Sequence, residues 1–471
     1  MNYMRAREER QKQFKITGIK LLHFMITVAI FYLFWLLFRY GQIFPNKDVG
    51  YRYNYLTALG FVIVLFFFNR TYNSYLLGYS RIRELAFAEA ISQLFATAVI
   101  YFVVSIAWNQ WKNPLWFLVM MIALCGLDVI WSYFANGYYF KLYPAKNTIL
   151  IYRNRHDKRR FGSIKGKPSE RLYTITEELM FDGKFSEIKE KLADYEAIFV
   201  AGVNSGCRNG ILKYCKEESI PGFFLPHVGD VIMQESKHIQ SFDSPVLFIT
   251  RSYIKPEYRI IKRCFDFTAS LVALVVLSPI MLVTALSIKL YDGGPAIYKQ
   301  VRLTQDGRKF KIWKFRSMRV DAEKDGVARL SSGDKDDRIT PIGKFVRKCR
   351  LDELPQLINI IKGDMSIVGP RPERPEIAEQ YYKKIPYFKL RLQVKAGLTG
   401  YAQIYGKYNT DPYEKLEFDL LYINNMGVLT DLKLIFATIS ILFLPESTEG
   451  VAAGQVTALE ESSDLNQNKL S

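Results

Sequence analysis

The sequence predicts three parts in order: an α-helical four-span membrane bundle, a small α/β Rossmann-like domain, and an α-rich, membrane-associated domain with a re-entrant helix hairpin. Three observations lead to this prediction. The 471 residues are 49% hydrophobic and yet 23% charged, so apolar and charged residues must be concentrated in different parts of the chain. Four long apolar stretches occupy the first 140 residues, and alternating strand and helix patterns follow them. A fifth apolar run opens a strongly basic C-terminal part.

The four apolar stretches have the composition of membrane spans. They cover residues 21–38, 55–68, 90–108 and 115–140. A helix needs ~20 residues to cross a ~30 Å hydrocarbon core, and Tyr53 and Tyr72 extend the short second stretch at its two ends. Basic residues gather before the first stretch, between the second and third, and after the fourth, which places both ends of a bundle at 1–146 in the cytosol. The long basic leader argues against a cleavable signal peptide.

Asp128 is the exception in the fourth stretch, because it is the only charged residue there. A carboxylate within a membrane is costly without a partner, so such residues often mark a proton or ligand path. It can equally bond to a neighbouring helix near the membrane interface. The sequence leaves both roles open.

Residues 147–251 have the pattern of a soluble α/β domain. We expect buried strands at 148–152 and 197–200, helices at 185–195 and 209–217, and a late strand at 246–250. Dinucleotide-binding domains of this kind carry a glycine-rich loop after the first strand. Here that strand runs into Arg153, Asn154, Arg155, His156 and Asp157, without a glycine. The Rossmann-like domain is therefore predicted to be degenerate, with a role in regulation, self-association as a homodimer, or spacing.

The apolar run at 265–290 is long enough to span a membrane, but Ser278-Pro279 interrupts it. Basic clusters precede and follow it, so a spanning helix would place one cluster outside, against the positive-inside rule. Proline removes one backbone hydrogen bond, and a serine hydroxyl can satisfy the carbonyl that is freed. We therefore expect a re-entrant helix that enters the inner leaflet and returns, with an ordinary fifth span as the alternative.

The charge of the chain points to an anionic partner. The net charge is +18, and residues 251–350 alone contain 22 Lys and Arg against 10 Asp and Glu. This excess lies beside the apolar run at 265–290, so anionic membrane lipids and phosphorylated lipids fit it better than nucleic acid, for which no binding motif is present. All four histidines precede Tyr258, which excludes Ser-His and Cys-His catalysis from the C-terminal part.

Two adjacent carboxylates, Asp352 and Glu353, lie among basic residues in the C-terminal part. Asp352 has the pattern of a helix N-cap, with Pro355 in the first turn and Gly363 at the end, and a helix N-terminus favours an ionised carboxylate. One carboxylate can attack phosphorus while the other binds Mg²⁺ together with substrate phosphates. A surface patch of ion pairs is the alternative interpretation.

Four basic residues are candidates to bind substrate phosphates: Lys314, Arg316, Arg347 and Arg371. Arginine holds phosphate oxygens through parallel donors. Asp334-Lys335-Asp336 resembles the DxD metal site of nucleotide-sugar glycosyltransferases, but it lies in a polar stretch that contains glycine, and we expect it to be solvated.

Five motifs in one order carry a family resemblance. They are Lys314-Phe315-Arg316-Ser317-Met318, Asp337-Arg338-Ile339-Thr340, residues 351–357, residues 362–373, and Gly397-Leu398-Thr399-Gly400. With them, residues 258–444 resemble the bacterial sugar transferase family, the polyprenyl-phosphate glycosyl-1-phosphate transferases. The whole chain resembles the long members, undecaprenyl-phosphate glucose or galactose phosphotransferases that prime capsule, exopolysaccharide or lipopolysaccharide O-antigen synthesis.

The resemblance implies a phosphoglycosyl transferase with its catalytic domain at 256–445, on the cytosolic face of the bacterial inner membrane. A sugar 1-phosphate would pass from a UDP-sugar to undecaprenyl phosphate, with release of UMP. Asp352 would form a covalent phosphosugar–aspartyl intermediate, and Glu353 would bind Mg²⁺. Arg347 and Arg371 would hold phosphates with help from Arg316.

Other features leave alternatives open. Ala396 and Gly406-Lys407 depart from the family pattern, so the sugar and the pathway are not identified. The apolar segment at 432–444 is too short to span and fits either the membrane interface or the core. The polar residues 446–471 are predicted to be disordered. A catalytically inactive membrane scaffold or regulator, and an inverting glycosyltransferase that uses Asp334 and Asp336, are the rival functions.

Overall fold

The structure is a computed structural model in which the chain forms two compact units, Met1–Leu225 and Pro226–Ser471. It describes residues 2–42, 52–107, 109, 111, 115–161, 168–239, 246–249, 254, 256–320, 322, 336–406 and 411–441. The polar segment at 446–471, Asp334 and Lys407 lie outside the described residues, so the predictions made for them stay predictions.

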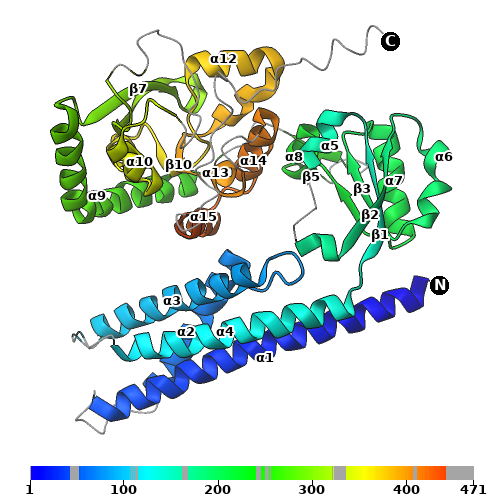
Figure 1. The fold of residues 1–471 in the computed structure, drawn as a ribbon, viewed down its shortest axis with the longest axis horizontal. Helices are drawn as coiled ribbons and strands as arrows, with labels where there is room; N and C mark the ends of the chain where they lie inside the picture. Colours follow the sequence, from blue (N-terminus) through cyan, green and yellow to red (C-terminus); the bar gives the residue numbers. More distant parts are fainter. Residues whose placement is uncertain are drawn as a thin grey trace. The chain divides into compact units, whose positions relative to one another are not determined.

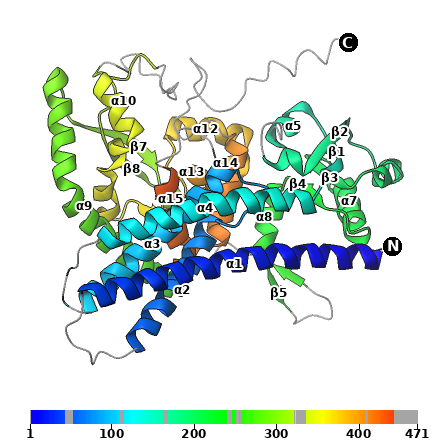
Figure 2. The ribbon, with the colours of Figure 1, turned by 60° about the horizontal axis from the view of Figure 1, so that its bottom comes forward.

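Four long helices open the first unit, as predicted. They are α1 (Asn2–Gln42), α2 (Arg52–Tyr72), α3 (Ile82–Ala107) and α4 (Leu115–Leu142), which Figures 1 and 2 show running alongside one another. Each contains a segment that is long and apolar enough to cross a membrane, and α9 of the second unit is a fifth such helix in the described part of the chain. The composition of these helices therefore identifies a membrane protein.

A four-stranded parallel sheet follows the helices in the order β2-β1-β3-β4 (Figure 2). The strands are β1 (Lys146–Tyr152), β2 (Tyr173–Met180), β3 (Ala197–Ala201) and β4 (Gly222–Phe224); between them lie α5 (Arg155–Phe161), η1 (Pro168–Arg171), α6 (Phe185–Ile188), η2 (Lys191–Asp194) and α7 (Ser205–Glu217). Residues of α6, η2 and α7 pack on one face of the sheet, and aromatic residues at the end of α4 pack on the other. The prediction of an α/β region after the helices is confirmed by this sheet.

Asp157, on helix α5 after β1, places a carboxylate close to the end of β3. Gly202, which follows β3, has a φ of 67°, and a Cβ built on it would lie 2.0 Å from Asp157 Oδ2. A carboxylate at this edge of the sheet repels phosphate.

The second unit has its own core and begins earlier than the predicted boundary at 251. Its elements are α8 (Val228–Gln234), β5 (Lys237–Ile239), β6 (Val246–Phe248), α9 (Pro256–Asp292), β7 (Ile297–Leu303), η3 (Gln305–Gly307), β8 (Lys309–Phe315), α10 (Pro341–Lys348), η5 (Leu351–Glu353), α11 (Gln356–Lys362), β9 (Ser366–Val368), α12 (Pro375–Lys384), η6 (Pro386–Gln393), β10 (Gly397–Thr399), α13 (Tyr401–Tyr405), α14 (Pro412–Asn424) and α15 (Val428–Ile441). Val228 and Val231 of α8 pack in one core with Leu434 of α15. Much of α15 is therefore a core helix.

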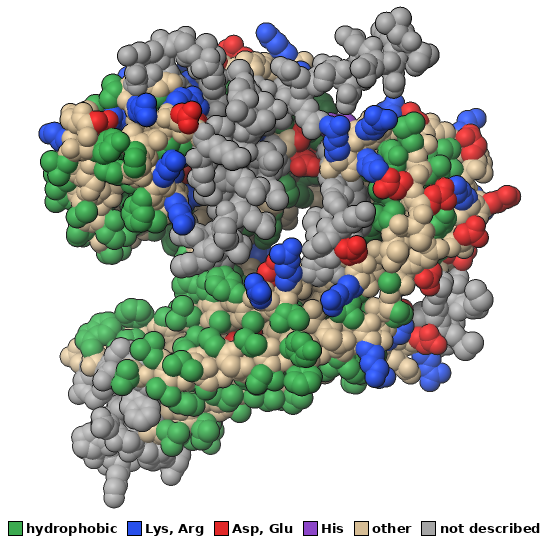
Figure 3. All heavy atoms as spheres, in the orientation of Figure 1, with side chains coloured by type: hydrophobic (Ala, Val, Ile, Leu, Met, Phe, Trp, Pro, Cys, Tyr) green, Lys and Arg blue, Asp and Glu red, His purple; other side chains and the backbone are tan. Residues whose placement is uncertain are grey.

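Helix α9 is bent into two arms (Figure 1). Pro279 lies inside it and has no N–H to donate to the carbonyl of Val275. The hydroxyl of Ser278 donates to that carbonyl at 2.7 Å, as the sequence suggested. Both arms expose large apolar side chains, and Figure 3 shows hydrophobic side chains gathered over them; examples are Phe267, Val272, Val276, Leu282 and Leu290. These surfaces need an apolar environment.

Candidate active site

Three short elements of the second unit bring the candidate residues together. Lys314 lies on β8, Arg347 on the last turn of α10, and the two adjacent carboxylates on η5. Thr340 caps α10 by accepting a hydrogen bond from Gly343 N at 3.0 Å. Arg350, in the left-handed conformation with a φ of 57°, separates α10 from η5 and turns the chain. The carboxylates therefore follow a sharp reversal of the backbone.

Two parallel strands, β9 and β10, fix the segment that carries Arg371. Gly369 N donates to Thr399 O at 2.8 Å, and Gly397 N donates to Pro370 O at 2.9 Å. Gly369 and Gly397 face each other so closely that a Cβ on Gly397 would lie 2.1 Å from Gly369 N. Two of the motifs that carry the family resemblance thus meet through their backbones, because neither glycine leaves room for a side chain.

We expect the substitution Gly397→Ala to destabilise the protein by about 1–3 kcal/mol and to lower turnover, because the added methyl group forces β9 and the Arg371 segment apart. Gly427→Ala is the matched control, since a Cβ there has no neighbour within 4 Å. Thermal unfolding of the two purified variants measures the difference. Equal stability of the two would contradict the close approach of the strands.

Glu353 is surrounded by cations. Its Oε1 lies 3.0 Å from Arg371, 3.7 Å from Lys314 Nζ and 3.9 Å from Arg350. Burial would raise the pKa of Glu353, but the neighbouring cations, Arg371 foremost, lower it to about 2. Glu353 is therefore an ionised carboxylate that holds the basic groups of the site in place.

The carboxylate of Asp352 has fewer contacts than that of Glu353. Among the described residues, no hydrogen bond or ion pair within 4 Å engages its carboxylate. Burial raises the pKa of Asp352, and the charge of Glu353 adds to this while Lys314 opposes it. The prediction that Asp352 caps a helix is wrong, because it lies within η5, and the residue that precedes α11 is Pro355. The predicted end of α11 is confirmed, with Gly363 left-handed at a φ of 88°.

Lys314 and Arg347, two further residues predicted to bind phosphate, also lie near the two carboxylates. Lys314 is largely buried, and burial lowers its pKa while Glu353 opposes the change. Arg347 lies near enough to Asp352 to lower the pKa of that carboxyl. Lys314, Arg347 and Arg371 thus surround the two carboxylates on η5, as the sequence predicted.

Arg316 lies apart from this group. Its NH1 donates to Asp292 Oδ2 at 2.7 Å, its NH2 donates to Asp292 Oδ1, and its Nε donates to Pro295 O at 2.9 Å. The side chain is 8% exposed, and a Cβ on Gly294 would lie 2.9 Å from its NH2. The geometry favours a structural role for Arg316, which ties the end of α9 to β8, over the phosphate contact expected from the sequence.

Arg391 on η6 is a residue that sequence reasoning missed. Its NH2 donates to Arg371 O at 2.9 Å, and its guanidinium pairs with Asp419 at 2.7 Å and with Glu373 at 3.5 Å. The side chain is 3% exposed. Arg391 therefore fixes the backbone of Arg371 from behind. No signal in the sequence separates it from the other basic residues between 383 and 395.

The prediction of a solvated Asp334-Lys335-Asp336 loop is wrong for Asp336. This residue is 5% exposed, and its carboxylate accepts from Arg338 Nε at 2.8 Å and NH2 at 2.7 Å. A carboxylate paired on both oxygens with arginine has no free edge for a metal ion. Asp336 thus stabilises the loop before α10.

Ala396, one of the departures from the family pattern, is also buried, and its N–H donates to Thr304 Oγ1.

Comparisons with known proteins place these residues in a family. A model described as bacterial sugar transferase matches residues 257–445. A Bacillus subtilis protein, provisionally named as an undecaprenyl-phosphate N-acetylgalactosaminyl 1-phosphate transferase, is 47% identical over 135 residues, which make up 29% of this chain and 74% of that protein. This chain belongs to the bacterial sugar transferase family.

Two longer relatives carry names that include a sugar donor and undecaprenyl phosphate. A UDP-glucose:undecaprenyl-phosphate glucose-1-phosphate transferase of Klebsiella pneumoniae is 40% identical over 229 residues, 48% of this chain and 49% of the relative. The protein of the same name from Escherichia coli K12 is 44% identical over 186 residues, 38% of this chain and 40% of the relative. The matched part is less than half the length of this chain and of each of these two relatives. The family model matches from near the start of α9 and includes every candidate residue described above.

Proposed function

We propose that this protein transfers a sugar 1-phosphate from a UDP-sugar to undecaprenyl phosphate, releases UMP, and thereby primes synthesis of a bacterial surface polysaccharide. The observation that carries this proposal is the difference between the two carboxylates on η5. Glu353 is held by three cations, whereas Asp352 beside it is free of hydrogen bonds among the described residues. The names of the relatives supply the substrate classes.

The chemistry divides into two displacements at phosphorus. The Asp352 carboxylate oxygen attacks the phosphorus that bears the sugar, and the bond between the two phosphates breaks, so that UMP leaves with the electron pair. A phosphate oxygen of undecaprenyl phosphate then attacks the same phosphorus and releases the Asp352 carboxylate. Lys314, Arg347 and Arg371 hold the phosphate oxygens as charge shifts between them.

Mg²⁺ fits this site through Glu353. Among the described residues, no group of three His, Cys, Asp or Glu side chains could hold a metal ion by itself. Mg²⁺ commonly binds one or two carboxylates and completes its shell with substrate phosphates and water. The ionised Glu353 supplies one carboxylate, and the diphosphate of the donor supplies oxygens. Bound there, Mg²⁺ would neutralise charge on the donor phosphates.

The bent helix α9 supports a re-entrant arrangement in the cytosolic leaflet of the inner membrane. Its two arms expose apolar side chains on both sides of Pro279, and basic residues flank both ends of the helix. A shallow hairpin would hold the active site at the level of the lipid phosphate, where a soluble UDP-sugar can also reach it. A helix that crosses the bilayer would instead separate the two basic flanks.

Cysteine labelling in sealed vesicles tests this topology. In a variant without native cysteines, we expect Lys309→Cys, at an exposed position of β8 after the hairpin, to react with an impermeant maleimide only from the cytosolic side. Trp111→Cys, an exposed position between α3 and α4, is the control that should react only from the opposite side. Labelling of both cysteines only from the side opposite the cytosol would establish a fifth span in place of the hairpin.

A panel of UDP-sugars tests the proposed reaction. Purified full-length protein with undecaprenyl phosphate and Mg²⁺ should release UMP from one or a few donors and form a lipid-linked diphosphosugar. Release of UDP would identify a glycosyltransferase of the DxD type. Absence of any nucleotide product across glucose, galactose and N-acetylated amino sugar donors would favour a scaffold.

Turnover should depend on pH through Asp352, which must be ionised to attack. Burial raises the pKa of Asp352 above the ordinary aspartate value of ~3.9. As the pH is lowered, kcat/KM should therefore begin to fall before pH ~3.9 is reached, and below the pKa of Asp352 it should fall about tenfold per pH unit. The rate of UMP release in buffers of constant ionic strength measures this, with circular dichroism to confirm that the fold persists. An unchanged kcat/KM down to pH ~4 would contradict a buried nucleophile.

A further inference from the structure

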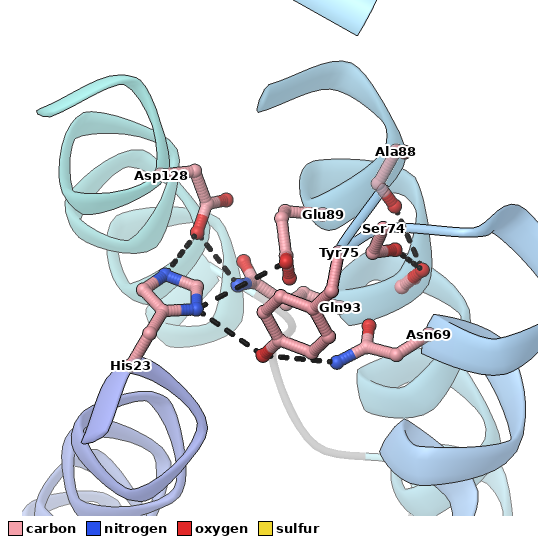
Figure 4. A network of polar contacts seen from close by, with 9 residues as sticks. His23, Asn69, Ser74, Tyr75, Ala88, Glu89, Gln93 and Asp128 are labelled. Atoms are coloured by element: carbon pink, nitrogen blue, oxygen red, sulfur yellow. Dashed lines mark hydrogen bonds and ion pairs between the residues drawn. The ribbon is translucent and has the colours of Figure 1, made fainter. Parts of the chain in front are cut away.

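The helical bundle contains a group of ionisable side chains that the proposed reaction does not use. His23 on α1, Glu89 on α3 and Asp128 on α4 are each at most 1% exposed. Figure 4 shows the three side chains pointing toward one another from different helices, with Tyr75 beside them. Asp128, which the sequence singled out, therefore contacts two neighbouring helices.

His23 connects the two carboxylates. Its Nε2 lies 3.3 Å from Asp128 Oδ1, and its Nδ1 lies 4.0 Å from Glu89 Oε1 and 3.2 Å from Tyr75 Oη. The imidazole ring is stacked on Trp131, with 4.3 Å between the ring centroids. Among the described residues Nε2 has no hydrogen-bond partner, so its approach to Asp128 is a close contact and not a hydrogen bond.

The remaining contacts differ between the two carboxylates. Gln93 Nε2 donates to Asp128 Oδ1 at 2.9 Å, so this oxygen has donors around it. Glu89 Oε1 and Asp128 Oδ2 are buried and have no hydrogen-bond partner in the part of the chain that the structure describes. Asn69 Nδ2 donates to Tyr75 Oη at 3.4 Å, so that oxygen accepts from Asn69 and can also accept from His23. Glu89 thus has no donor that would stabilise a negative charge at Oε1.

The charges of the group do not balance if both carboxylates are ionised. One imidazolium offsets one carboxylate, and among the described residues no Lys or Arg pairs with Glu89 or Asp128. The other titratable groups nearby are Tyr75 and Cys125, neither of which is cationic. An uncompensated charge in the interior of a membrane bundle costs several kcal/mol.

We propose that His23, Glu89 and Asp128 form a proton-binding site in the membrane bundle, in which Glu89 holds the proton as a neutral carboxyl group. The proton removes the charge from the carboxylate oxygen that has no donor among the described residues, whereas Asp128 accepts a hydrogen bond from Gln93. The ligand of the site is the proton, and the site joins α1, α3, α4 and the segment that carries Tyr75.

Infrared spectroscopy of the full-length protein in lipid nanodiscs tests the proton on Glu89, because a protonated carboxyl group has a C=O stretch that a carboxylate lacks. We expect wild-type protein at neutral pH to show such a band, with a shift in D₂O, and Glu89→Gln to lose it. Glu84→Gln, on the exposed face of the same helix, is the matched control and should keep the band. A wild-type spectrum without the band, or a band unchanged in Glu89→Gln, would overturn the proposal.

A second measurement applies to wild-type protein alone, should Glu89→Gln not fold. The proton on Glu89 is held by the folded bundle and released more readily by the unfolded chain, so the folded state binds one more proton, and this contribution to stability must fall as pH rises. We expect the unfolding equilibrium constant to increase by up to tenfold per pH unit between about pH 5 and pH 8. Thermal unfolding in nanodiscs that shows constant or rising stability over this range would contradict the site.

Discussion

Asp352→Asn should abolish turnover, with a loss of at least about 10⁴-fold in kcat, because an amide oxygen is not a competent nucleophile at phosphorus. The change keeps the shape of the side chain and removes no hydrogen bond that engages it among the described residues, so the protein should still fold and insert. Release of UMP from the preferred donor measures kcat.

The covalent intermediate gives this experiment a second readout. Intact-mass analysis after rapid acid quench, with donor and no lipid acceptor, should show wild-type protein carrying one added phosphosugar and Asp352→Asn carrying none. Asp306→Asn is the matched control: Asp306 is exposed on η3 and has a φ of 57°, a conformation that asparagine tolerates. Substantial turnover by Asp352→Asn would rule out attack by this carboxylate, whatever the fate of the control.

Arg391→Met should destabilise the second unit by about 3–5 kcal/mol, because it leaves the buried carboxylate of Asp419 without the arginine that pairs with it. It should also lower turnover, since Arg391 no longer fixes the backbone of Arg371. Chemical denaturation followed by tryptophan fluorescence measures the first effect, and UMP release measures the second.

Two comparisons separate the buried charge from general damage. Arg308→Ala removes an exposed arginine paired with Asp364 at 3.2 Å and should cost no more than about 1 kcal/mol. The double variant Arg391→Met/Asp419→Asn should be more stable than Arg391→Met alone, because it removes the unpaired charge of Asp419. If the single and double variants are equally unstable, the loss comes from packing instead of charge.

The elements that the sequence predicted well are those specified by local patterns. The four long helices and the strands β1 and β3 are runs of apolar residues of the right length, and the break in α9 follows from a proline, which cannot donate to Val275 whatever its surroundings. Strand β2 was missed because its residues alternate between partly buried and exposed positions and include two glutamates. Its place in the sheet depends on pairing with β1.

In the candidate site too, some features could be predicted from the sequence and others depend on tertiary contacts. The sequence by itself grouped Asp352, Glu353 and a set of basic residues into one candidate site, through five motifs that resemble those of the bacterial sugar transferase family. Only the tertiary structure decided how they are paired: Arg316 with Asp292, Asp336 with Arg338, Arg391 behind Arg371, and Glu89 and Asp128 around His23. The physical reason is that residue type fixes what charge a side chain can carry, whereas its partner and its burial depend on elements far apart in the chain, which meet only after folding.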